Sequence, residues 1–202
     1  MRTILLSLCL IMGTILSAQN NVLIEIENAN AAYKVITGNF VRTQTNVAKG
    51  TSIKTDGTLY IVGEDQMAQY YKAPSTDLLI INGNDFYMIR GKKTNKFNIE
   101  KNKTMRSLRN TLLSCVHGKP MVLATENGAE ITTEKKANEY EVVLISTKKT
   151  PRGYAKIVLA YDLKSKLLTK MRMDEYNGNS TLYEMSDMKV NTAIDTNVFH
   201  TP

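Results

Sequence analysis

The chain contains little cysteine. Cys9 and Cys115 are the only two among its 202 residues. Cys9 lies in an N-terminal segment that we expect to be removed, which leaves Cys115 without a partner for an intramolecular disulfide. A chain of this kind depends on its apolar core or on a ligand for stability. Cys115 is either a small buried apolar residue or a nucleophile, and the first role is the more common one.

Histidine is also scarce, and no catalytic or metal-binding pattern surrounds it. His117 and His200 are the only histidines. Neither lies beside a nucleophile motif of the G-x-S-x-G type, and no pair of residues has the spacing of metal ligands. Glycine-rich phosphate loops are missing as well. These absences predict a protein that is not an enzyme and that binds neither a metal nor a cofactor.

No apolar run reaches the roughly 20 residues of a membrane-spanning helix. Residues 4–16 are a shorter apolar core, with a basic residue before it and small residues after it. This order is typical of a secretory signal peptide. We therefore predict a cleaved signal over residues 1–18 and a single exported domain over residues 19–202. LSLC around Cys9 resembles a lipobox, but it lies inside the apolar core, so cleavage after Ala18 is the prediction.

Acidic residues are outnumbered by basic ones. There are 26 Lys and Arg against 19 Asp and Glu, and the net charge is +7. The basic residues are scattered and show no aromatic-basic stacking motif of the kind used on nucleic acids, so no nucleic-acid partner is predicted. The charge is either a solvated surface or a source of weak attraction to anionic membranes and acidic partners.

The stretch DLLIINGNDFYMIR, residues 77–90, is the clearest structural signal. Asn82-Gly83 is the preferred pair for a type I′ turn, so two strands flank it in a hairpin. Both parities of the second strand are largely apolar, whereas a sheet with one wet face alternates apolar and polar residues. A further segment must therefore cover the second face of the hairpin. Residues 104–116, which have apolar residues at helical spacing, are the expected cover.

Most other segments are predicted to be short strands joined by turns. The expected strands are 39–45, 53–62, 67–72, 94–99, 129–136, 139–147, 154–162, 166–176 and 181–190, followed by an extended tail to Phe199. Helices are expected over 21–36 and 104–116, with Thr104 as the candidate N-cap, and residues 119–128 are expected to be an irregular loop. About eleven strands in series predict one antiparallel sheet that must curl. The predicted fold is α+β, mainly β: a half-open (unclosed) antiparallel barrel with helices across its concave side.

Apolar residues recur with period two on successive strands. The pairs are Leu59/Ile61, Leu79/Ile81, Phe86/Met88, Val143/Ile145, Ile157/Leu159 and Met171/Met173. Eight methionines follow the predicted signal, and methionine suits surfaces that accept variable apolar shapes. These residues form either a filled core under the helices or the lining of a cavity.

Several short motifs follow one another in a defined order along the chain. After the signal and the first helix come T-G-N-F-V-R-T-Q-T, G-T-L-Y-I-V and Y-K-A-P-x-x-x-L-L-I-I-N-G-N-D-F-Y. The helix over 104–116 is then followed by Y-x-V-V-L, Y-D-x-x-x-x-L-L-x-K-M and N-T-x-I-x-x-x-V-F. Their order resembles the LolA family of periplasmic outer-membrane lipoprotein carriers, and the resemblance covers nearly all of residues 19–202. It implies an unclosed barrel with an α-helical lid over a hydrophobic cavity.

The resemblance also implies partners and a cavity lining. Family members take acylated lipoproteins from an inner-membrane lipoprotein-releasing transporter and pass them to an outer-membrane acceptor. On this basis, the period-two pairs and Met67 form the floor of a lipid cavity, and Met105, Leu108 and Leu112 face it from the lid. The protein is expected to be a monomer.

One departure from the family pattern concerns the lid. The family usually has a basic residue followed by proline after the G-T-L-Y strand, and the basic residue helps to latch the lid. Gly63 and Glu64 stand there in this chain, and Arg42 on the neighbouring strand is the candidate substitute. A carrier of another lipid on the same fold therefore stays open as an alternative, as does an exported β-protein with a filled core that binds a protein partner.

Overall fold

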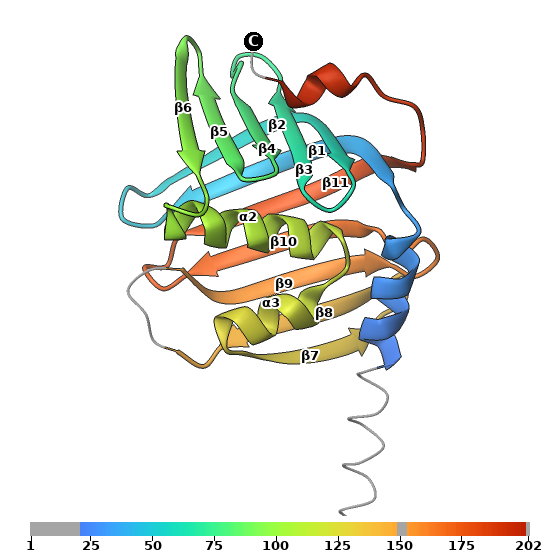
Figure 1. Ribbon diagram of the computed structural model, residues 1–202. Coiled ribbons are helices and arrows are strands. Elements are labelled where there is room, and N and C mark those ends of the chain that lie inside the picture. The colour runs from blue at the N-terminus through green and yellow to red at the C-terminus, as the bar shows by residue number, and fades with distance from the viewer. Residues whose placement is uncertain (1–20, 149–152, 201–202) are drawn as a thin grey trace, which may run out of the picture.

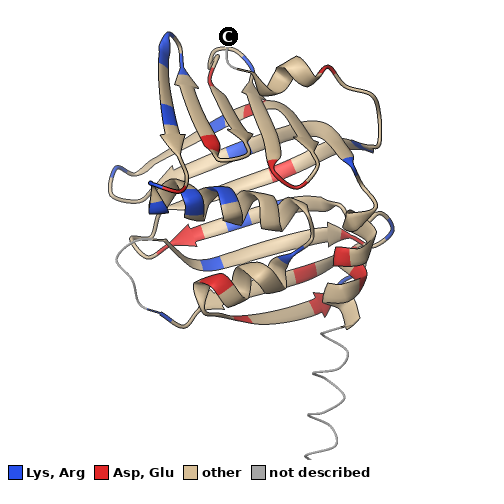
Figure 2. Cartoon of the chain, in the orientation of Figure 1, with Lys and Arg blue, Asp and Glu red and all other residues tan. Residues whose placement is uncertain are grey.

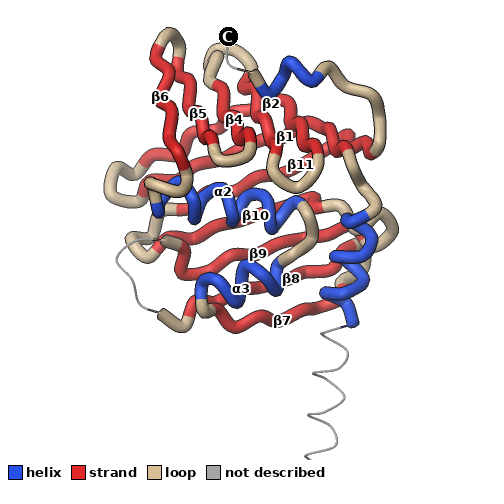
Figure 3. The backbone as a smooth tube through the Cα atoms, viewed as in Figure 1, coloured by secondary structure: helices blue, strands red, loops and turns tan. Residues whose placement is uncertain are grey.

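A computed structural model describes residues 21–148 and 153–200 of the chain (Figure 1). The predicted signal segment, residues 1–18, lies outside these ranges. The described part is one sheet with helices on its concave side (Figure 3). The strands are β1 Val35–Asn46, β2 Thr51–Val62, β3 Gln66–Tyr71, β4 Leu78–Asn82, β5 Asp85–Arg90, β6 Lys93–Asn98, β7 Ala129–Lys135, β8 Glu139–Ser146, β9 Tyr154–Asp162, β10 Leu168–Glu175 and β11 Ser180–Val190.

The sheet is antiparallel throughout, and its order is β6-β5-β4-β3-β2-β1-β11-β10-β9-β8-β7. Each neighbouring pair is consecutive in the chain except β1 and β11, the first and last strands, which meet in the middle. The two edge strands, β6 and β7, are not paired with each other in the described part of the chain. The sheet therefore curls without closing, which confirms the predicted unclosed barrel.

Among the described residues, three helices lie on the concave side: residues 21–31, α2 Lys103–Val116 and α3 Pro120–Asn127. The first ends sooner than predicted because Val35 already begins β1. The cap of α2 is Asn102, whose side chain accepts a bond from Met105 N at 3.1 Å, rather than the predicted Thr104. No helix within the described ranges combines the length and the apolar character needed to cross a membrane.

The helix α3 corrects the prediction of an irregular loop over residues 119–128. Pro120 occupies the first turn, where its missing N–H costs nothing. Gly128 ends the helix in the left-handed conformation, with φ 60°. The helix has only eight residues and little amphipathic pattern, so Pro120 and Gly128 are the only sequence features that indicate it.

The hairpin β4–β5 is covered on both faces, but by two different segments. Its concave face, including Leu79, Ile81 and Phe86, belongs to the main core together with the buried part of α2. Its outer face forms a second cluster with Phe199 of the short 3-10 helix η1 Thr196–Phe199. The prediction that residues 104–116 would supply the second cover is therefore wrong, because the C-terminal tail covers that face.

Candidate functional site

The concave face of the sheet is apolar and holds most of the predicted cavity residues. Those buried in the main core are Leu59, Ile61, Met67, Leu79, Ile81, Phe86, Leu112, Ile157, Leu159, Met171 and Met173. Those partly buried against this core are Met88, Met105 and Leu108. The period-two pattern thus assigned the inward parity correctly on β2, β4, β5, β9 and β10.

The assignment fails on β8. Ile145 is 50% exposed and Val143 is only partly buried, whereas Val142 and Leu144 are buried in the core. The register explains the difference, because directly paired residues of an antiparallel sheet point to the same face. Leu144 pairs with the inward-facing Ile157. The correct inward residues of β8 are therefore Val142 and Leu144.

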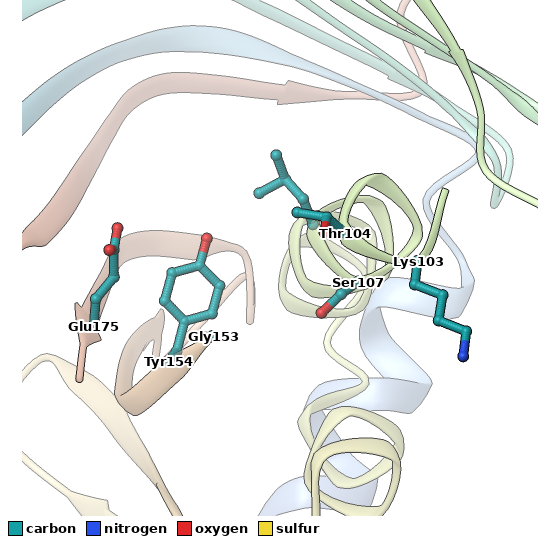
Figure 4. Close-up of a pocket in the computed structure, with 7 residues that line it drawn as sticks. Lys103, Thr104, Ser107, Gly153, Tyr154 and Glu175 are labelled. Atoms are coloured by element: carbon teal, nitrogen blue, oxygen red, sulfur yellow. The ribbon is translucent and has the colours of Figure 1, made fainter. Parts of the chain in front are cut away.

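Side chains fill most of the interior, but a cleft of about 340 Å³ opens between the start of α2 and the ends of β9 and β10 (Figure 4). It is lined by Lys103, Thr104, Ser107, Leu108, Gly153, Tyr154 and Glu175. A space of about 40 Å³ shares Ser107, Gly153 and Tyr154 with the cleft. Leu123, Leu144 and Ile157 supply part of its apolar wall. The cleft, whose lining residues are mostly polar, thus adjoins a small space with a partly apolar wall, and the two are called the entrance and the floor.

A β-bulge accounts for two residues of the entrance that sequence analysis missed. Asp174 pairs with Lys156, and Glu175 then pairs with Tyr154, so Ala155 is skipped. Simple alternation from the inward-facing Ile157 would turn Tyr154 outward. The extra residue instead places Tyr154 and Glu175 opposite each other on the concave side, as bulges often do beside functional sites. Burial raises the pKa of the Tyr154 hydroxyl, which therefore stays protonated.

Helix α2 runs from this cleft to the other end of the barrel, and its two halves differ in burial. The buried residues, Thr111, Leu112, Leu113, Cys115 and Val116, all lie in the C-terminal half. Cys115 is fully buried, as predicted, and burial raises the pKa of its thiol, so it is not a reactive thiolate. In the N-terminal half, Met105 and Leu108 are only partly buried.

The α2–α3 junction, His117–Lys119, is fastened to the rest of the fold. Gly118 has φ +64° and lies so close to the first helix that a Cβ atom there would meet Ile26 Cγ2 at 2.8 Å. Lys119 Nζ lies 2.9 Å from Glu64 Oε1 in the β2–β3 turn. The bond from Lys119 lowers the pKa of the Glu64 carboxyl. Glu64, the departure from the family pattern, is thus the partner of a lysine between α2 and α3.

His117 and Asn30 line a small cavity of about 50 Å³ at this junction. Asn30 Nδ2 donates to Ile26 O at 2.9 Å and to Lys166 O at 2.8 Å, which connects the first helix to the β9–β10 turn. His117 is 8% exposed. Burial lowers the pKa of its imidazole, the nearby Lys119 lowers it further, and Glu64 opposes them. His117 is therefore favoured in its neutral form.

Arg42 does not make the predicted latch contact. Its Nη1 donates to Tyr71 Oη at 2.7 Å, and its guanidinium carbon lies 4.4 Å from the centre of the Tyr71 ring. Tyr71 Oη in turn donates to Gln69 Oε1 at 3.0 Å. Among the hydrogen bonds of the described residues, none joins Arg42 to α2 or α3. Its contacts are with other strands of the sheet, and the ion pair that reaches the lid is that of Lys119 and Glu64.

The fold and site define a class of protein: an unclosed antiparallel barrel whose apolar concave face is covered by helices. A family model described as outer membrane lipoprotein carrier protein LolA matches residues 31–202. The chain therefore belongs to the LolA family. A search of curated protein sequences finds no match.

Solved structures show the same fold at low sequence identity. A conserved protein from Thermus thermophilus has a TM-score of 0.55 and 8% identity, with 91% of this chain and 94% of that one covered. A DUF1329 family protein from Desulfovibrio piger has a TM-score of 0.52 and 12% identity, with 92% and 97% covered. MucB has a TM-score of 0.50 and 14% identity, with 92% and 63% covered.

Proposed function

We propose that this protein is a periplasmic carrier that binds the acyl chains of lipoproteins and escorts them from the inner to the outer membrane. One observation carries the proposal: the apolar concave face is covered by a helix that is buried at one end and borders an open cleft at the other. Such a cover can admit an apolar chain at the loose end without unfolding at the fixed end. The domain over residues 19–202 acts as a carrier and not as an enzyme.

The free energy of transferring an acyl chain from water favours a carrier whose helical cover can open at one end. Each buried CH₂ group is worth about 0.8 kcal/mol, so a long chain costs on the order of 10 kcal/mol to keep in water. The cleft of about 340 Å³ lies at the lower end of ligand pockets, which span roughly 300–1,000 Å³. A long chain therefore needs more space than the closed form offers. We infer that the N-terminal half of α2 moves outward, so that Met105, Leu108 and the buried strand residues become the lining.

The lid is held only moderately, as release of cargo requires. The Lys119–Glu64 pair lies at the surface, and pairs of this kind contribute up to about 1 kcal/mol. We assign it the role of fastener that the sequence analysis gave to Arg42. An inner-membrane transporter would deliver the cargo and an outer-membrane acceptor would receive it, with the protein as a monomer in between.

Mass spectrometry of cargo tests this proposal. The protein purified from a periplasmic fraction is expected to carry acylated peptides or lipoproteins in native spectra. Free lipids of another class would support the second candidate function, a carrier of other lipids, which the acidic Glu64 in place of a basic latch residue favours. An empty protein that takes up no fluorescent acyl probe would contradict both.

A matched pair of variants locates the binding site. Leu108→Glu places a charge on the lid at the cleft, whereas Ile145→Glu places one on the outer face of the sheet. Because burial of an unpaired charge is costly, we expect Leu108→Glu to weaken uptake of an acyl probe at least about tenfold. Ile145→Glu should change it by less than about twofold. Equal effects would place the probe outside the concave cavity.

A further inference from the structure

The entrance of the cleft carries polar groups in a defined arrangement. Tyr154 and Glu175 lie side by side on the wall formed by β9 and β10, and Ser107 of α2 lies across from them (Figure 4). The bulge in β9 pairs Tyr154 directly with Glu175. A bulge is a local irregularity of the strand, and here it places two polar side chains over an apolar floor. An apolar chain in the floor would leave its polar end between these groups.

The side chains of Ser107, Tyr154 and Glu175 determine which polar end of an acyl ligand fits the entrance. A carboxylate is an acceptor only, and the hydroxyls of Ser107 and Tyr154 can donate. Glu175 Oε2 already accepts a bond from Asn177 Nδ2 at 3.0 Å. Its Oε1 atom makes no hydrogen bond with the described residues and is available to an N–H donor of a ligand. An amide at the start of an acyl chain offers both an N–H for Glu175 and a carbonyl oxygen for the hydroxyls.

A phosphate would fit this entrance poorly. It carries negative charge and offers acceptors, so it would face the Glu175 carboxylate at close range. The cations of α2 do not compensate inside the cleft. Lys103 lines it, but its ammonium group points away from the Tyr154 wall (Figure 4). Arg106 donates from Nε to Ile99 O at 2.9 Å and is not among the residues that line the cleft.

We propose that Ser107, Tyr154 and Glu175 are specificity-determining residues that select acyl chains linked through an amide, as in N-acylated peptides, against anionic phospholipids. The inference rests on the proposed carrier function and names the feature of the cargo that the entrance recognises. Glu175 accepts the amide N–H, and Tyr154 and Ser107 donate to the carbonyl oxygen. The same carboxylate repels a phosphate at that position.

Competition binding tests the inference. The purified protein is loaded with the neutral reporter dansyl-hexadecylamide, which is displaced by an uncharged N-palmitoyl dipeptide amide or by palmitoyl lysophosphatidylglycerol. Both competitors carry the same chain and differ in the polar end. We expect the wild-type protein to prefer the peptide about tenfold or more, the effect of one hydrogen bond to a charged group.

Three variants separate the contributions of Glu175 and Tyr154 to the preference for the peptide from the effect of a control site. Glu175→Gln should reduce the preference to about twofold, mainly because the lysophospholipid binds better, and Tyr154→Phe should weaken peptide binding about fivefold. Glu184→Gln removes an exposed carboxylate on β11 and should leave the preference unchanged. A wild-type protein that binds both competitors equally, or a Glu175→Gln variant with unchanged preference, overturns the inference while the carrier function stands. A wild-type protein that does not bind the neutral reporter overturns both.

Discussion

The two halves of α2 differ in how they are attached to the barrel. In the C-terminal half, four apolar side chains are buried and Tyr161 Oη donates to Cys115 O at 2.8 Å. In the N-terminal half, the apolar residues are partly buried and basic residues cover the exposed side (Figure 2). The tight half adjoins the first helix, and the loose half borders the cleft.

The difference in burial between the two halves of α2 shows how a small domain can combine a stable fold with a cavity that opens locally. Local opening requires few buried contacts in the moving segment, while the global stability is set by the well-packed remainder. The loose half of α2 satisfies the first condition and the junction with α3 the second. The variants below test whether the division lies between Leu108 and Leu112, as burial indicates.

Truncation of one leucine in each half should give the largest contrast. Leu112 is 1% exposed, so Leu112→Ala should lower the free energy of unfolding by about 2–5 kcal/mol through lost burial and a new cavity. Leu108 already borders a cleft, and Leu108→Ala should cost less than about 1 kcal/mol. Urea denaturation followed by circular dichroism measures both. Similar losses would mean that the lid is held equally along its length.

The second-largest effect on the free energy of unfolding should come from crowding at the α2–α3 junction. Gly118→Ala forces a Cβ against Ile26 and Asn30 in addition to a left-handed backbone, and should cost about 2–4 kcal/mol. Gly91→Ala is the matched control, because Gly91 has φ +55° but no atom within 4 Å of the added Cβ. It should cost about 1 kcal/mol from the backbone alone. If the two alanines cost the same, the junction is not tightly packed on the first helix.

The ion pair between the lid and the β2–β3 turn should affect lid opening more than stability. Lys119→Met or Glu64→Gln should lower the free energy of unfolding by less than about 1 kcal/mol, since the Glu64 side chain is 81% exposed and its ion pair is screened by solvent. The pair also limits opening at the junction end of the lid, so stopped-flow uptake of an acyl probe should accelerate by up to about fivefold when it is lost. The double reversal Glu64→Lys with Lys119→Glu should restore the wild-type rate. An unrestored rate would indicate that the lysine and the glutamate act separately.

Whether a feature of this structure can be predicted from the sequence depends on how far apart in the chain the interacting residues lie. The alternation on β10 correctly placed Met171 and Met173 inward, because a strand with one apolar parity leaves a single choice. On β8 the run from Val142 to Ile145 is apolar on both parities, so only the register with β9 decides. No local pattern indicates a skipped residue, which is why the entrance residues were missed.

The ion pair that holds the lid was even harder to predict from the sequence. Lys119 and Glu64 are 55 residues apart in the chain, and their contact depends on how the sheet curls. Arg42 was a reasonable candidate by adjacency, but its inward parity places it beside Tyr71 of β3. Fold class followed from many weak local signals that agree, whereas these contacts each depend on one pair of residues and therefore on the complete fold.

The smallest expected effect concerns the pH dependence of the lid junction. Burial lowers the pKa of His117, so the unfolded chain takes up this proton before the folded one does. The folded protein should therefore lose stability as the pH falls below about 6.5, the ordinary histidine value, and the loss should level off below the folded pKa. Above that range the effect vanishes. Lys119 opposes protonation of His117 and Glu64 favours it.

Removal of the imidazole isolates this contribution. His117→Gln should show a shallower loss of stability between pH 7 and pH 5 than the wild-type protein, whereas His200→Gln, at an exposed position of the tail, should follow the wild-type curve. Urea denaturation at pH intervals measures the slopes. If acyl-probe uptake also accelerates at low pH in the wild-type protein but not in His117→Gln, the tight end of the lid opens on protonation, and the distinction between its two halves holds only near neutral pH. Uptake independent of pH in both proteins would confine lid motion to the loose half.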